Sequence, residues 1–145
     1  MNKVIKIIAI VAIIYVAIVV LFESLLGYFQ PEGEDTVVIT TRTADGDSHD
    51  RVLTLLTDND SYYVAANHWP RAWYRQALDN PNVELTMNGE RRAFRAVPVT
   101  GAEHERMMEE HAHSLVFLIL TGFPPRYFLR LDPIDQSTLG RAPGS

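Results

Sequence analysis

An uncharged apolar run near the N-terminus constrains this chain more than any other feature of its sequence. Residues 4–26 read VIKIIAIVAIIYVAIVVLFESLL, and no charged residue lies between Ile7 and Phe22. A helix rises about 1.5 Å per residue, so about 20 apolar residues cross the hydrocarbon core of a bilayer. The run therefore predicts a transmembrane anchor over residues 1–29.

A cleaved signal peptide is the main alternative explanation of this run. The run is longer than a typical signal core, and the segment after it, ESLLGYFQPEGE, is bulky or acidic and offers no small-x-small cleavage site. A buried core helix is disfavoured, because a helix that is apolar on every face has no solvent side. The sequence therefore favours a single-pass anchor that contacts membrane lipid.

The charges beside the run bear on its orientation. Lys3 and Lys6 precede it, and acidic residues follow it. The positive-inside rule favours a cytoplasmic N-terminus and an outward-facing domain. Acidic residues count for little in that rule, so the side of the membrane on which the domain lies stays open.

The rest of the chain is long enough for one folded domain. The 145 residues carry a net charge of −5, which argues against a nucleic-acid binder held by phosphate contacts. The absence of cysteine excludes disulfides, thiolate chemistry and cysteine-ligated zinc. We expect a linker over residues 30–35, a domain over residues 36–135 and a disordered tail over residues 136–145.

Short strands joined by tight turns dominate the expected domain. Asn88-Gly89 is typical of a type I′ hairpin, and Asp58-Asn59-Asp60 indicates another tight turn. The extended stretches are expected at residues 36–41, 52–57, 61–66, 83–87, 91–99 and 126–131.

Two helices interrupt these strands. The first is expected to begin near Pro70, since proline is favoured in a first turn, and to end before Asn80. The second opens on a predicted capping box, in which Thr100 and Glu103 satisfy each other's backbone donors. It is expected to reach about His113, with a continuation through the apolar residues 115–120 left open.

One segment is more specific than composition. Residues 67–83 read NHWPRAWYRQALDNPNV and are followed by a strand, an Asn-Gly hairpin, a basic strand and a Thr-Gly-x-Glu helix. This order, over residues 37–133, resembles the deazaflavin-dependent nitroreductase family. The resemblance implies a flavin-type split β-barrel related to pyridoxamine phosphate oxidases, mainly β with two helices and here preceded by one transmembrane helix.

The resemblance also implies a chemistry and a site. Members of that family pass a hydride from the reduced deazaflavin coenzyme F420 to quinones or nitro compounds, and the start of the first helix sits against the cofactor. The implied cofactor-binding residues are Asn67, His68, Trp69, Arg71 and Trp73, followed by Arg51 and Thr54.

The chemistry of these residues is also compatible with a cofactor site. A helix start offers free backbone N–H groups to an anion. Trp73 and Tyr74 suit either the wall of a ring-shaped ligand or the core. Further arginines, expected on neighbouring strands, are candidates for holding a phosphate or carboxylate tail or for a solvated face: Arg51, Arg91, Arg92 and Arg95.

Two departures from the family pattern keep other functions open. The turn at residues 44–50 reads ADGDSHD, where the family has a Lys- and Arg-containing turn, and residues 115–120 replace a tyrosine-rich segment. FMN therefore stands as an alternative cofactor, and a chain without cofactor as another. In the latter case the barrel is an inactive binding module for a small anion or a membrane protein partner.

The remaining candidate residues have ordinary structural explanations. His104, Met108 and His111 share a helical stripe, but a metal site needs more converging ligands, so we expect a polar helix surface and no metal. Arg126 opens a strand and is expected to pair with an acidic neighbour at the surface. Residues 115–123 are expected in the core, or otherwise as an apolar patch facing lipid or a lipophilic acceptor. A homodimer is left open.

Overall fold

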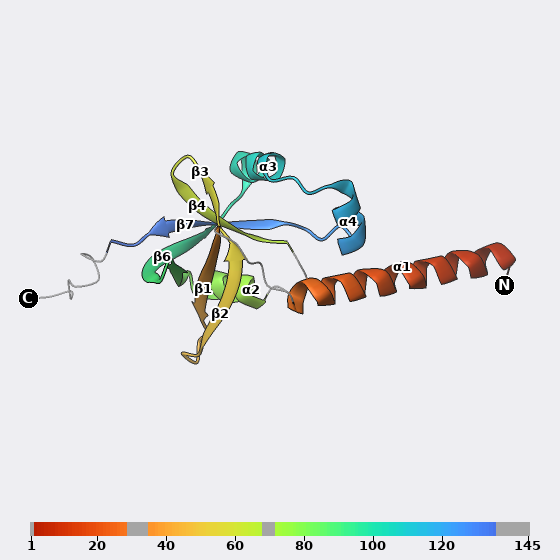
Figure 1. Ribbon diagram of the computed structural model, residues 1–145, viewed down its shortest axis with the longest axis horizontal. Helices are drawn as coiled ribbons and strands as arrows, with labels where there is room; N and C mark the ends of the chain where they lie inside the picture. The colour runs from red at the N-terminus through yellow and green to blue at the C-terminus, as the bar shows by residue number, and fades with distance from the viewer. Residues whose placement is uncertain (1, 29–34, 68–71, 136–145) are drawn as a thin grey trace, which may run out of the picture.

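A long helix and a curled sheet with three shorter helices make up the parts of the chain that the computed structural model describes, residues 2–28, 35–67 and 72–135. Helix α1 (Lys3–Tyr28) projects away from the sheet (Figure 1). Among the described residues it is the one helix long and apolar enough to cross a membrane, and none of its most apolar window is buried. The described residues therefore do not bury α1 as a core helix would be buried, and a signal sequence can have the same length and composition.

The sheet has seven strands, all paired antiparallel, in the order β2-β1-β5-β6-β7-β4-β3. The strands are β1 (Thr36–Arg42), β2 (Ser48–Thr54), β3 (Leu56–Asp58), β4 (Ser61–Ala66), β5 (Asn82–Met87), β6 (Glu90–Pro98) and β7 (Tyr127–Pro133). The sheet curls until β2, at one edge, contacts β4 near the other. Because β2 has a ladder partner only in β1, the barrel stays split at this seam.

Local turn chemistry fixes two of the hairpins. Asn88 and Gly89 both have positive φ, at 50° and 80°, as a type I′ turn requires, and Asn59 and Asp60 do the same at 46° and 64°. Both predicted turns are confirmed. The stretch predicted at residues 52–57 is instead divided at Leu55, between β2 and β3.

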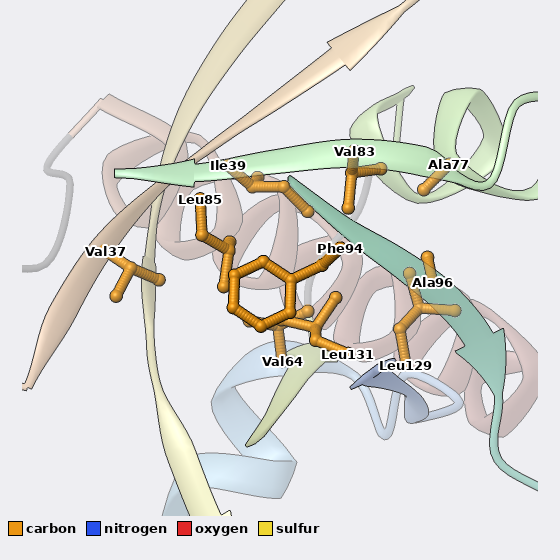
Figure 2. Close-up of a cluster of buried hydrophobic side chains, with 10 residues drawn as sticks. All are labelled: Val37, Ile39, Val64, Ala77, Val83, Leu85, Phe94, Ala96, Leu129 and Leu131. Carbon is orange, nitrogen blue, oxygen red and sulfur yellow. The ribbon is translucent and has the colours of Figure 1, made fainter. Parts of the chain in front are cut away.

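Two apolar clusters form the core, one on each side of strands β4 and β7. The inner cluster fills the barrel (Figure 2) with Ile39, Val64, Leu85 and Leu129 among its members. The outer cluster lies beneath helix α3 (Gly101–Glu110) and contains Phe128. Because α3 covers the outer face, consecutive residues of β7 are both fully buried, and the alternation typical of a half-exposed strand is lost there.

The helices differ from the predicted pair. Helix α2 (Ala72–Asp79) ends where expected, but α3 stops at Glu110, and a separate helix, α4 (Leu115–Thr121), begins after its own N-cap, Ser114. The core position expected for residues 115–123 is wrong, since Leu115 and Val116 are among the most exposed large apolar side chains.

The predicted capping box at the start of α3 is also wrong. Thr100 occupies the N-cap position but makes no side-chain capping bond. The Glu103 carboxylate instead accepts hydrogen bonds from the Tyr63 hydroxyl at 2.8 Å and from Arg130 at 3.1 Å. Burial, and then the contact with Glu103, raise the pKa of Tyr63. A charged and a phenolic partner hold the carboxylate away from the helix backbone.

Three predictions fall partly or wholly outside the described residues: the start of the first helix near Pro70, the linker over residues 30–35 and the tail over residues 136–145. The domain boundaries therefore stay predictions.

Candidate functional site

A cavity of about 500 Å³ lies at the seam where β2 faces β4. Its volume is in the range of small-molecule sites. Five parts of the chain surround it: the end of α1, strands β2 to β4, helix α2, the loop after α3 and the residue before β7. Its lining residues are Leu26, Arg51, Val52, Leu53, Thr54, Leu56, Ala65, Ala66, Asn67, Trp73, His111, Ala112, His113 and Arg126.

Four of the seven residues predicted for the cofactor site line this cavity: Arg51, Thr54, Asn67 and Trp73. The other three, His68, Trp69 and Arg71, lie outside the described residues. Arg51 and Thr54 are on β2, Asn67 follows β4, and Trp73 is in the first turn of α2. Three separate elements therefore bring together residues that are distant in sequence.

Strand register places an arginine inside the split barrel. Arg51 pairs with Ile39 and Leu53 pairs with Val37, and directly paired residues share a face of the sheet. Ile39 and Val37 belong to the buried inner cluster. Arg51 and Leu53 therefore lie on the interior face, at the edge strand that borders the cavity.

Arg126 is the second cationic residue of the cavity. Its Nε donates a hydrogen bond of 2.6 Å to Oδ1 of Asn67, and its Nη1 donates to the backbone carbonyl of His111. Its guanidinium carbon lies 4.9 Å from the centroid of the Phe128 ring. The group is thus held by an amide, a carbonyl and an aromatic face.

Arg126 has no carboxylate within ion-pair distance in the part of the chain that the structure describes. The surface ion pair predicted for it is therefore wrong. Burial lowers the pKa of Arg126, which nevertheless stays charged because a guanidinium does not deprotonate in proteins. A partly buried cation with neutral partners favours an anion in the adjoining cavity.

His111 adds a second buried polar group to the wall of the cavity. It caps the C-terminus of α3 and lines the cavity. Its Nε2 is buried and has no hydrogen-bond partner among the described residues. A buried polar atom without a partner carries a free-energy cost, which a ligand in the cavity would remove.

Both aromatic residues of α2 are partly buried and pack against the inner core cluster, but they differ in their relation to the cavity. Trp73 lines the cavity and packs against the inner core cluster. Tyr74 does not line it, and instead stacks on Tyr127 with ring centroids 5.3 Å apart. Trp73 and Tyr74 meet edge to face at 5.9 Å. Of these two aromatic residues, Trp73 is therefore the one placed to wall a ring-shaped ligand.

The predicted set of neighbouring strand arginines does not form. Strand β6, which carries Arg91, Arg92 and Arg95, is separated from β2 by β1 and β5. The guanidinium of Arg91 pairs with Glu84 at 3.4 Å, and that of Arg92 pairs with Glu90 at 2.6 Å. The pairing of β1 with β5, which the composition of single strands does not reveal, decides this separation.

The acidic turn lies at the far end of β2 from the cavity. β2 runs from Ser48 at the hairpin to Thr54, and only its second half lines the cavity. At about 3.3 Å per residue, Asp47 is about 13 Å along the strand from Arg51, beyond the screening length of about 8 Å at physiological salt. The side chain of Asp50 accepts a hydrogen bond from Thr40 at 2.6 Å. Asp47 therefore does little to oppose an anion near Arg51, whereas Asp50, the neighbour of Arg51, lies on the opposite face of β2.

No group of three or more His, Asp or Glu side chains could hold a metal ion among the described residues. His104 packs edge to face on Phe128, at 5.6 Å between ring centroids, whereas His111 lines the cavity. The two ends of the predicted histidine stripe therefore have different surroundings.

Sequence reasoning missed Arg126 and the roles of His111 and His113 as lining residues. A signal for Arg126 exists: residues 121–131 contain no acidic residue, so no neighbour in sequence could neutralise it. The histidines follow α3 in a short loop, and only the tertiary fold brings that loop to the cavity.

Comparison with known proteins gives one family and several related structures. A family model described as F420H(2)-dependent quinone reductase matches residues 15–116. A structure described as an F420-H2 dependent reductase (FDR-A) is 18% identical, with a TM-score of 0.56, over 72% of this chain and 99% of that one. No curated protein matches the chain.

Two further structures share the fold. One described as a domain-swapped dimer is 16% identical, with a TM-score of 0.56, over 70% of this chain and 82% of that one. A Listeria innocua protein classed with the pyridoxamine 5′-phosphate oxidases is 14% identical, with a TM-score of 0.51, over 70% of this chain and 85% of that one. The predicted split-barrel fold is confirmed, with three helices rather than two in its described domain.

Proposed function

Because the chain belongs to the F420H(2)-dependent quinone reductase family, we propose that it is a membrane-tethered reductase that passes a hydride from reduced F420 to a lipophilic acceptor such as a quinone or a nitro compound. The family expected from the sequence is confirmed by this match, and F420 takes precedence over FMN as its cofactor. The bound coenzyme supplies the hydride, so the protein's own part is binding and orientation.

The observation that carries the proposal is the chemistry of the cavity. Arg126 presents a partly buried positive charge with neutral partners, and Arg51 adds a second cation from the interior face of β2. A coenzyme with phosphate and carboxylate groups supplies the anions that such a pair lacks. The residues present therefore fit an anionic cofactor.

Several of the lining residues then have a role in the proposal. Arg51 and Arg126 hold anionic groups, and Asn67 fixes the orientation of the Arg126 guanidinium. Trp73 and the apolar side chains of Leu53 and Leu56 exclude water from the ring. The remaining residues of the predicted cofactor set, Thr54, His68, Trp69 and Arg71, keep the cofactor-facing role expected from the sequence.

The proposal includes retention of α1 as an anchor. Leu26, near the end of α1, is part of the cavity wall, so removal of the helix as a signal sequence would open the site. An anchored enzyme also keeps its site close to an acceptor that partitions into lipid, which raises the effective concentration of that acceptor.

Turnover by the full-length chain in lipid nanodiscs tests this proposal. We expect oxidation of reduced F420 when a long-chain quinone is present in the bilayer, and little protein-dependent oxidation of reduced FMN at equal concentration, both measured without oxygen and after subtraction of the rate without protein. Arg92→Ala, which changes an exposed arginine outside the cavity, should leave the rate unchanged. Saturable binding of F420 without turnover on any quinone or nitro acceptor would instead indicate a binding module.

A further inference from the structure

Helix α4 and the turn after it expose an apolar surface that a water-soluble domain would ordinarily bury. No charged residue lies in residues 114–125, SLVFLILTGFPP. The side chains of Leu115, Val116, Ile119 and Phe123 are all exposed. Exposed apolar patches of this kind mark a surface that contacts another apolar phase.

This segment packs against one face of α1. The Tyr15 hydroxyl donates a 2.9 Å hydrogen bond to the carbonyl of Ile119, and the rings of Phe22 and Phe117 meet edge to face at 6.1 Å. Residues 15, 19, 22 and 26 recur at helical spacing, so they lie on one face of α1. Figure 1 shows α4 beside the domain-proximal part of α1.

A glycine permits the close approach of the two segments. Gly122 ends α4 with φ of 73°, and a Cβ added to it would lie 2.9 Å from Cγ1 of Val19. Any larger residue there would meet both the strained backbone and α1. The turn at the tip of this segment is therefore built against the helix.

The depth of the contact follows from the length of α1. The candidate span runs from Lys3 to Leu26, and Tyr15 lies near its middle. Eleven residues of rise put Tyr15 about 17 Å from Leu26, roughly half of a 30 Å hydrocarbon core. A bilayer that surrounds Tyr15 must also surround Ile119, because a hydrogen bond joins the two residues.

We propose that residues 114–125 form a re-entrant hairpin, which enters the bilayer beside α1 as far as Tyr15 and returns to the domain at Arg126. This inference rests on the membrane anchoring in the proposed function. In this proposal, the exposed apolar surface contacts lipid. Residues 115–120, which replace the family's tyrosine-rich segment, then serve to enter the membrane.

The N–H groups of the return limb, residues 122–125, are satisfied without water. The N–H of Gly122 donates to Ile119, and the N–H of Phe123 donates to Leu118 at 2.9 Å. Pro124 and Pro125 have no N–H to satisfy. Non-helical backbone enters a bilayer only where its polar groups are satisfied or shielded, and these four residues leave no N–H group without a partner.

The hydroxyl groups of the hairpin are paired in the same way. Ser114 Oγ accepts from the N–H of Phe117 at 3.2 Å and so caps α4. Thr121 Oγ1, fully buried, donates to the Phe117 carbonyl at 2.8 Å. Tyr15, the polar residue in the middle of the span, is paired with Ile119. These hydroxyl groups therefore keep a hydrogen-bond partner when they are transferred to hydrocarbon.

The hairpin joins the cavity at both of its ends. The hairpin begins directly after the lining residues His111 and His113, and it ends directly before the lining residue Arg126. Leu26 of α1 lines the same cavity. The wall of the site is thus continuous with the two membrane-embedded elements, and a lipophilic acceptor can reach the cavity from the lipid phase.

Single cysteine labels on the full chain test the hairpin, because the native sequence contains no cysteine. Three positions of similar exposure are matched: Val116→Cys on α4 at 67%, Ile13→Cys on α1 at 68%, and Arg92→Cys on β6, where the native side chain is 63% exposed. Each labelled variant is placed in nanodiscs, and spin-label relaxation is measured with oxygen, which enters lipid, and with a nickel chelate, which does not.

The hairpin predicts that labels at residues 116 and 13 respond to oxygen and are protected from nickel, whereas the label at residue 92 shows the reverse. A lipid-facing residue 13 with a nickel-accessible residue 116 would leave the anchor standing and overturn the hairpin. A nickel-accessible residue 13 would remove the anchor and the hairpin together. Dipolar broadening at residue 116, with protection from both agents, would mean that a second copy covers α4 and would also overturn it.

Turnover separates this inference from the proposed function. With the hairpin in place, Val116→Arg should slow reduction of a long-chain quinone in the bilayer while leaving reduction of a water-soluble acceptor within about twofold of the native rate. Equal loss with both acceptors would contradict entry from the lipid. Loss of F420 oxidation by the native chain with every acceptor would instead count against the reductase itself.

Discussion

Arg126→Ala should weaken the binding of F420 by about 10- to 100-fold. A hydrogen bond to a charged group contributes about 1.5–3 kcal/mol, and each 1.4 kcal/mol is tenfold in affinity. The guanidinium is held on the cavity wall by Asn67 and the carbonyl of His111, so it loses little freedom when an anion binds. The dissociation constant is measured by calorimetric titration of the full chain in nanodiscs.

Two further variants separate charge from shape in this prediction. Arg126→Lys keeps the positive charge but loses the planar fork, so we expect an intermediate affinity. Arg92→Ala removes an exposed cation that is paired with Glu90 and should leave the affinity unchanged. An affinity for F420 unaltered by Arg126→Ala, in a variant that melts at the native temperature, would contradict the assignment of Arg126 to the anion.

Phe128→Ala should lower the free energy of unfolding of the domain by about 3–5 kcal/mol. Phe128 is fully buried and is the largest of the completely buried side chains. It fills the cluster beneath α3 with Met107 and Tyr63, and it supports both the His104 ring and the Arg126 guanidinium. For a domain of about 100 residues, a loss of this size lowers the melting temperature by more than about 10 °C.

Thermal unfolding in detergent checks this prediction against two controls. Phe128→Leu retains most of the buried volume and should cost less than about 1.5 kcal/mol if the site repacks. Tyr127→Ala removes the exposed neighbour, which stacks on Tyr74, and should cost about 0.5–1.5 kcal/mol. A melting temperature for Phe128→Ala no lower than that of Tyr127→Ala would show that the outer cluster contributes little to stability.

The parts of the fold that sequence reasoning found are those with local causes. Asn88-Gly89 and Asn59-Asp60 are residues that tolerate the positive φ of a tight hairpin turn, so the hairpins could be placed from the residues alone. The predicted capping box failed for a non-local reason, because the partners of Glu103 come from β4 and β7. The Glu103 carboxylate, which accepts a hydrogen bond from Arg130, does not cap the N-terminus of its own helix.

The residues of the candidate site also differ in whether their cause is local in sequence. Asn67 and Trp73 could be proposed from the sequence because they lie in the one segment with a specific pattern, whereas Arg126 resembled an ordinary cation at the start of a strand. Its burial depends on the loop after α3, where the His111 carbonyl accepts a hydrogen bond from its guanidinium. The apolar residues of α4 were expected in the core because the sequence does not say which apolar phase, protein or lipid, covers a helix.

Titration of the native full-length chain with oxidised F420 is the decisive measurement for the proposed function. Calorimetry gives the affinity, and quenching of tryptophan fluorescence reports a ligand beside Trp73. We predict saturable binding of F420 in the micromolar range, tighter than that of FMN, with quenching that saturates at the same ratio of ligand to protein. No binding of F420 at millimolar concentration by the folded chain would contradict a cofactor site in this cavity.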